Sequence, residues 1–199
     1  DTLIGFGINP YEWESDPGVT ADRLGNFYTV TLCFNPAAPT SGICVYKSTD
    51  GGITWLNPSV VVSNVAFEDK ELLTCDQTGG IYDSNLYVSW TRFQSGSPST
   101  IFVSRSTDGG VEWSFPLQIS DGIYGTQWSV PAVGANGEVY IAWVQFTTNN
   151  KILLRKSTNG GISYSSIDTI FTPLTKGAPT LNGNVLVFCY PALATDVSS

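Results

Sequence analysis

The stretch Ser48-Thr49-Asp50-Gly51-Gly52-Ile53-Thr54-Trp55 decides the fold of this chain, because the same pattern returns twice. The second copy reads STDGGVEW over residues 106–113, and the third reads STNGGISY over residues 157–164. A repeat with a period of roughly 50 residues is typical of stacked or radially arranged supersecondary units. The positions that define the pattern are Ser48, Asp50, Gly52, Trp55, Ser106, Asp108, Gly110, Trp113, Ser157, Asn159, Gly161 and Tyr164.

Each copy of the pattern is predicted to be a β-hairpin. An alternating, β-branched run precedes it, as in residues 43–47, and such runs indicate half-buried strands. The Asp-Gly-Gly or Asn-Gly-Gly core supplies positions that accept positive φ, and its Asx side chain can bond the backbone of its own turn. A short strand follows, as in residues 59–62. We therefore expect the Asx side chains to hold the hairpins and the aromatic residues to pack onto the sheet.

A second pattern lies upstream of each hairpin, where a strand leads through a Gly- or Asn-containing turn to another strand, as in residues 130–143. One unit is therefore four antiparallel strands, which is the blade of a β-propeller. We predict an all-β fold, a propeller or part of one, in one domain over residues 1–199. Its blades are expected at residues 14–63, 64–122 and 123–172, with a partial blade at 173–199 and a ring-closing strand at 1–10.

The repeated octapeptide resembles the Asp-box of the bacterial neuraminidase repeat, which sialidases share with several other secreted propeller families. The resemblance covers most of the chain, and the first two copies match the motif well. The third departs from it with Asn159 and Tyr164. The resemblance implies a sialidase-like propeller and a carbohydrate partner, but it does not by itself imply an activity, because function belongs to sites rather than to folds.

The composition narrows the classes of partner. The formal net charge is −8 with only 9 Lys and Arg residues, which argues against nucleic acid, because phosphate binding needs a basic face. No apolar run has the length of a membrane span. The absence of Met suggests a processed or an excerpted product, and the Thr-, Ser- and Asn-rich composition with few Lys residues fits a secreted protein outside the cell or at its surface. No cofactor is expected.

The four cysteines have no metal-ligand spacing, so no metal site is predicted. Cys33 ends one predicted strand and Cys44 begins the next, and in an antiparallel pair they can face each other. A Cys33–Cys44 disulfide would stabilise the fold by about 3 kcal/mol in the loop-entropy model. The alternative is two separate buried thiols.

The longer, variable connections are expected on the face opposite the Asx-Gly-Gly hairpins, where ligand sites usually concentrate. Aromatic rings and polar groups that converge there suit sugars, because rings stack on a pyranose while polar groups bind its hydroxyls. Trp90 and Trp143, at matching positions of second strands, are instead expected in the core. The candidate ligand-binding residues are Trp13, Trp128, Tyr124, Arg92, Lys70 and Gln127.

The chain has no His, which excludes Ser-His-Asp and Cys-His mechanisms. The resemblance to sialidases implies a clamp of three arginines, but of the four arginines only Arg92 falls on the loop-rich face. A glycosidase that uses two carboxylates remains an alternative, with Asp69, Glu71 and Asp16 as its candidate catalytic residues.

The leading hypothesis is a glycan-binding or structural surface module. The alternatives are a glycoside hydrolase, exo-sialidase-like or of the two-carboxylate type, whose site is completed by residues outside this chain, and a subunit that self-associates through open sheet edges.

Overall fold

A computed structural model describes residues 11–35, 40–174, 180–181, 185–186 and 190–196. The described part is all-β and contains three four-stranded antiparallel sheets, each with its strands in sequence order. The strands are, in blade 1, β1 (Trp13–Ala21), β2 (Phe27–Phe34), β3 (Ser41–Ser48) and β4 (Ser59–Asn64); in blade 2, β5 (Phe67–Cys75), β6 (Leu86–Phe93), β7 (Thr100–Ser106) and β8 (Leu117–Gln118); in blade 3, β9 (Thr126–Val133), β10 (Val139–Gln145), β11 (Lys151–Ser157) and β12 (Asp168–Phe171).

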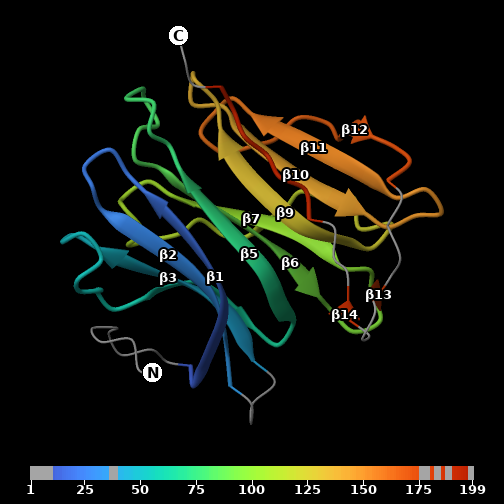
Figure 1. Cartoon of the computed structure of the whole chain (residues 1–199), viewed down its shortest axis with the longest axis horizontal. Helices are drawn as coiled ribbons and strands as arrows, with labels where there is room; N and C mark the ends of the chain where they lie inside the picture. Colours follow the sequence, from blue (N-terminus) through green and yellow to red (C-terminus); the bar gives the residue numbers. More distant parts are fainter. Residues whose placement is uncertain (1–10, 36–39, 175–179, 182–184, 187–189, 197–199) are drawn as a thin grey trace.

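The predicted fold class is confirmed, as a partial propeller. The three sheets stand next to one another, and their first strands, β1, β5 and β9, are neighbours in space (Figure 1). In the part of the chain that the structure describes, the sheets do not close into a ring. The strand predicted at residues 1–10 lies outside the described residues, as does much of the predicted partial blade at 173–199. Within that region the structure describes two short paired strands, β13 (Thr180–Leu181) and β14 (Val185–Leu186).

Side chain-to-backbone hydrogen bonds hold each Asx-Gly-Gly hairpin together. In blade 2, Gly110 N donates to Ser106 Oγ at 2.9 Å, while Val111 N and Glu112 N each donate to Asp108 Oδ1 at 3.0 Å. The third copy keeps the same scheme with an amide, because Ser163 N donates to Asn159 Oδ1 at 3.0 Å. Asn159 therefore replaces Asp here and keeps the turn bond from the residue four positions on.

The core of the molecule lies between the blades. One cluster of buried side chains joins blades 1 and 2 and includes Tyr28, Val61 and Trp90. A second cluster joins blades 2 and 3 and includes Ile119 and Trp143. Trp90 and Trp143 are fully buried, as predicted. Burial of such large side chains stabilises each interface by about 1.5–3 kcal/mol per residue.

The predicted Cys33–Cys44 disulfide is wrong, because both residues are free, buried thiols. The strand register gives the reason. Cys33 lies opposite Gly42 and Cys44 lies opposite Thr31, so the two cysteines are diagonal neighbours rather than a facing pair. Contact with Cys33, together with burial, raises the pKa of the Cys44 thiol. They occupy a small cluster with Tyr46 on the face of blade 1 that points away from blade 2.

Candidate functional site

A β-bulge interrupts the innermost strand of every blade at the same position. The ladder between β1 and β2 shifts between Ser15 and Gly18, and that between β5 and β6 shifts between Asp69 and Leu72. The shift in blade 3 falls on β9 opposite Trp143. Each bulge holds a non-glycine residue at positive φ, and these are Asp16 (54°), Lys70 (56°) and Trp128 (63°).

These three residues are unusual, because a side chain at positive φ costs on the order of 1–3 kcal/mol. Bulges redirect side chains and are common beside active sites. Here the three bulges line one cavity of about 290 Å³ between the innermost strands, which we call the axial pocket. Its lining residues are Asp16, Pro17, Lys70, Glu71, Leu72, Trp128, Ser129, Val130, Tyr190 and Pro191.

One ammonium group bridges two carboxylates at this pocket. Lys70 Nζ lies 2.5 Å from Asp16 Oδ2 and 3.3 Å from Asp69 Oδ1, and Lys70 N also donates to Asp69. Burial alone would lower the pKa of Lys70, but the hydrogen bond to Asp16 and the charge of Asp69 raise it above its usual value. The group therefore stays charged at neutral pH and ties blade 1 to blade 2.

Glu71 lies at the same pocket but is almost fully withdrawn from solvent, with 2% of its surface exposed. Neither carboxyl oxygen makes a hydrogen bond of good geometry. Burial raises the pKa of Glu71 to about 9, the nearby charge of Asp16 adds to the effect, and backbone N–H groups of Glu71 and Leu32 offset part of it. The carboxyl is therefore protonated and neutral at pH 7.

Two aromatic side chains, Trp128 and Tyr190, also line the pocket. The ring of Trp128 meets Phe146 edge-on, with ring centroids 5.4 Å apart, and lies 5.0 Å from Tyr190. Sequence reasoning missed Tyr190, because it follows a region expected to be an incomplete blade. It also gave no sign of Ser129, whose buried hydroxyl has no hydrogen-bond partner in the described residues.

The structure brings together only part of the predicted site. Asp16, Lys70, Glu71 and Trp128 line the axial pocket, and Asp69 reaches it through Lys70. Of the remaining candidates, Trp13 stacks on Phe34 at the strand ends of blade 1 with 56% of its surface exposed. Tyr124 is exposed in the connection to blade 3, and Gln127 pairs with β10; neither lines the axial pocket.

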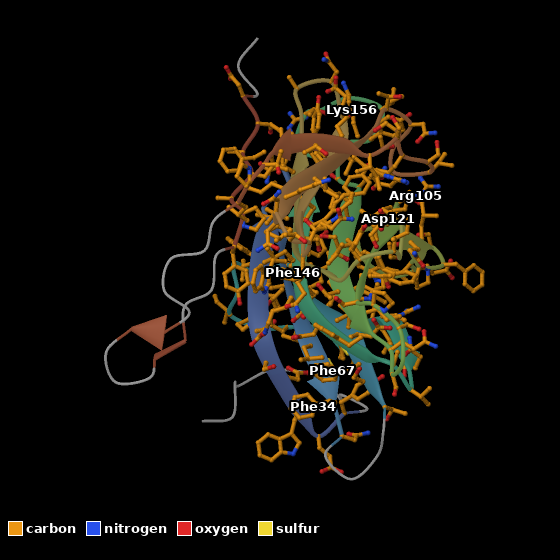
Figure 2. The ribbon with its side chains drawn as sticks, turned by 90° about the vertical axis from the view of Figure 1, so that its right-hand side faces the viewer. Phe34, Phe67, Arg105, Asp121, Phe146 and Lys156 are labelled. Carbon is orange, nitrogen blue, oxygen red and sulfur yellow. The ribbon has the colours of Figure 1, made fainter. Side chains whose placement is uncertain are left out.

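Arg92 also lies elsewhere, where it performs a structural task. Its guanidinium forms an ion pair with the buried Glu68 at 2.6 Å and stacks over the ring of Phe102 at 3.9 Å. In Figure 2, Phe67, the residue next to Glu68, lies toward the lower end of the view together with Phe34. Phe146, which contacts Trp128 of the axial pocket, lies nearer the middle of the view. None of the four arginines is among the residues that line the axial pocket. The clamp that the sialidase resemblance implies is therefore not formed at this pocket.

A larger cavity of about 440 Å³ lies at the other end of the innermost strands. The described residues that line it include Thr20, Thr74 and Gln77 together with the C-terminal residues Leu193–Thr195, and none of those described carries a charge. We favour the smaller axial pocket as the functional site, because charged and aromatic groups converge there. Among the described residues, no three His, Cys, Asp or Glu side chains are placed to hold a metal ion.

No protein-family model and no curated protein sequence matches the chain. Solved structures do. The Hadza microbial sialidase Hz136 superposes with a TM-score of 0.66 at 14% identity, over 81% of this chain and 38% of its own. The α-L-arabinofuranosidase Arb93A from Fusarium graminearum superposes with a TM-score of 0.61 at 16% identity, over 80% of this chain and 49% of its own. The α-L-arabinanase of Penicillium chrysogenum, solved with arabinobiose, superposes with a TM-score of 0.58 at 14% identity, over 94% of this chain and 54% of its own.

This likeness shows the fold: the chain is part of a β-propeller of the kind found in these three glycoside hydrolases. It spans between about two fifths and about half of the length of each of them. Of the described residues, none belongs to a helix long and apolar enough to cross a membrane.

Proposed function

We propose that the chain is a secreted, Asp-box propeller module that binds carbohydrate in the axial pocket. The observation that carries the proposal is the set of three matching bulges, each with a residue at positive φ, that point Asp16, Lys70 and Trp128 at one cavity. Strain that recurs at one place in three blades favours a functional site over a packing accident. Carboxylate, ammonium and aromatic groups are the combination that sugar hydroxyls and ring faces require.

The charges of the pocket favour a neutral sugar. Two carboxylates, Asp16 and Asp69, share the single ammonium of Lys70, and the protonated Glu71 adds no charge. An acidic sugar would bring a further negative charge into this excess of carboxylate, at a Coulombic cost. The resident ammonium is already paired and cannot serve such a ligand without giving up Asp16 or Asp69.

Calorimetric titration with lactose, 3′-sialyllactose and arabinobiose tests the proposal. Lactose and 3′-sialyllactose form a matched pair that differs by one acidic sugar, so we expect the neutral member to bind more tightly. Lys70→Gly keeps the positive φ but removes the ammonium, and we expect affinity for the neutral sugars to fall at least about tenfold. Phe115→Ala, an exposed ring distant from the pocket, should leave binding unchanged. Binding of 3′-sialyllactose alone, or binding insensitive to Lys70→Gly, would contradict the proposal.

One observation favours glycoside hydrolysis as a second candidate function. A glycosidase needs a protonated carboxyl as general acid beside an ionised one, and Glu71 has a raised pKa next to Asp16. In the present conformation, however, the Glu71 oxygens are covered, so a substrate would reach them only after movement. Chromogenic arabinosides and galactosides test this candidate. Turnover that Glu71→Gln or Asp69→Asn abolishes would favour hydrolysis, and absence of turnover with intact sugar binding would exclude it.

A further inference from the structure

The C-terminal residues Tyr190–Thr195 lie along the innermost strand of blade 3. The ring of Tyr190 is 5.0 Å from that of Trp128, near the beginning of β9, and Thr195 Oγ1 donates to the backbone oxygen of Val133, at the end of β9. Trp128 and Val133 are five residues apart, and so are Tyr190 and Thr195. The segment therefore runs parallel to β9, and Figure 1 shows it in red beside that strand. We call Tyr190–Thr195 the strap.

The strap is close to fully extended. A strand rises about 3.3 Å per residue, and no conformation spans more than about 3.6 Å per residue. Five steps of the strap can therefore follow five steps of β9 only if the strap is stretched out as well. Pro191 favours this shape, because its ring fixes its own φ and it biases the preceding Tyr190 toward the extended region.

The strap forms one side of two cavities. Tyr190 and Pro191 line the axial pocket, and Leu193–Thr195 line the larger cavity at the other end of the innermost strands. The other described walls of both cavities come from β1, β5 and β9. Because β9 is the last strand of its own sheet, the strap stands where a fourth innermost strand would follow around the axis.

We propose that the strap is part of the sugar site, and that sugar binding and docking of the strap reinforce each other. Tyr190 contacts the bound sugar with its ring. Thr195 is not among the residues that line the axial pocket, so it is a positioning residue that acts through the strap. The inference rests on the proposed function, because it concerns the same pocket.

The coupling follows from the cost of ordering the strap. Docking fixes the backbone of each strap residue, which costs conformational entropy. A sugar that touches both Tyr190 and the bulges at Asp16, Lys70 and Trp128 makes contacts that exist only when the strap is docked. It therefore binds the docked state more tightly and shifts the population toward that state. By linkage, a firmly docked strap raises the affinity for the sugar by the same factor.

Calorimetric titration of the full chain with the tightest-binding neutral sugar of the probe set tests the proposal. Tyr190→Ala removes the ring and should weaken binding about tenfold, whereas Tyr190→Phe keeps the ring and should bind nearly as well as wild type. Thr195→Val removes the hydroxyl and should raise the Kd about fivefold, the effect of one ordinary hydrogen bond, whereas Thr195→Ser keeps the hydroxyl and the affinity. Thr158→Val, at an exposed position of the blade 3 hairpin, is the matched control.

Amide hydrogen exchange of the full chain, measured by mass spectrometry for residues 190–196, gives the reciprocal observation. Saturating sugar should slow exchange in the strap, and Thr195→Val should speed it in the absence of sugar. A purely structural role of Thr195 would change exchange in the strap without changing the affinity for sugar. Circular dichroism of each variant checks that the fold is retained.

The outcomes separate this inference from the proposed function. Sugar binding that depends on Lys70 but not on Tyr190 or Thr195 would overturn the inference alone. Higher affinity in Thr195→Val would show that the strap competes with the sugar, which also overturns it. Exchange in the strap that sugar leaves unchanged would do the same. A chain that binds none of the neutral sugars would overturn both proposals.

Discussion

Glu71→Gln is expected to stabilise the chain at pH 8 by at most about 5 kcal/mol and to remove most of the loss of stability that the wild type shows between about pH 4.5 and pH 9. In the folded chain the pKa of Glu71 is raised to about 9, whereas in the unfolded chain it returns to its ordinary value near 4.5. At any pH between these two pKa values, Glu71 holds a proton in the folded state that it has lost in the unfolded state. The free energy of unfolding therefore falls as pH rises, by about 1.4 kcal/mol per pH unit.

The stability that the neutral carboxyl provides is fully present below about pH 4.5 and is lost as pH rises toward 9. Glutamine has nearly the same shape and no titration, so urea unfolding of Glu71→Gln should show a flatter dependence on pH. Glu112→Gln, on an exposed hairpin, is the matched control and should behave as wild type. Identical pH profiles for Glu71→Gln and wild type would show that Glu71 is ionised or exposed.

Glu68→Ala should destabilise the chain by about 3–5 kcal/mol, the usual cost of removing one partner of a buried ion pair. Glu68 is 0% exposed and accepts hydrogen bonds from Trp90 Nε1 at 2.7 Å and from Arg92 Nε at 2.8 Å. Without the carboxylate, the guanidinium of Arg92 loses its ion-pair partner and remains over the ring of Phe102, and the indole N–H of Trp90 loses its acceptor. Because natural domains have only about 5–15 kcal/mol of stability, this change alone brings the chain near unfolding.

Glu68→Gln is the informative control for that variant. Its amide oxygen can still accept from Trp90 but cannot form the ion pair with Arg92, so an intermediate loss is expected. The midpoint and slope of urea unfolding curves give both values. Equal stability of Glu68→Ala and wild type would mean that the Glu68–Arg92 pair contributes nothing to the contact between strands β5 and β6.

The fold was predictable because its signals are local. Asp50-Gly51-Gly52 and its copies fix hairpins through their own side chains, and a repeat period of one blade leaves few architectures open. The core positions of Trp90 and Trp143 followed from matching places in the repeats. The predicted Cys33–Cys44 disulfide was wrong because of the strand register. The ladder pairs Cys33 with Gly42, and the sequence alone does not specify the register of two paired strands.

The acidic residues of the axial pocket, Asp16, Asp69 and Glu71, were predictable from the sequence, but the backbone geometry of the pocket was not. Asp16-Pro17-Gly18 has the composition of a bend, but nothing in Lys70 or Trp128 announces positive φ, because these residue types rarely adopt it. Their conformation is imposed by the three matching bulges, which are a property of the assembled sheets. Trp13 and Arg92 were predicted at the site from their residue types and from their expected place on the loop-rich face. Each is engaged instead by a neighbour in its own blade, Phe34 and Glu68 respectively.

Amide chemical shifts, followed during titration with the tightest-binding neutral sugar of the probe set, show whether the sugar binds at the axial pocket. We expect the backbone amides of Asp16, Lys70 and Trp128, one from each blade, to shift together and to report a single dissociation constant. Shifts confined to one blade, to the hairpins at 48–55, 106–113 and 157–164, or to the strand ends around Trp13 and Phe67 would contradict it.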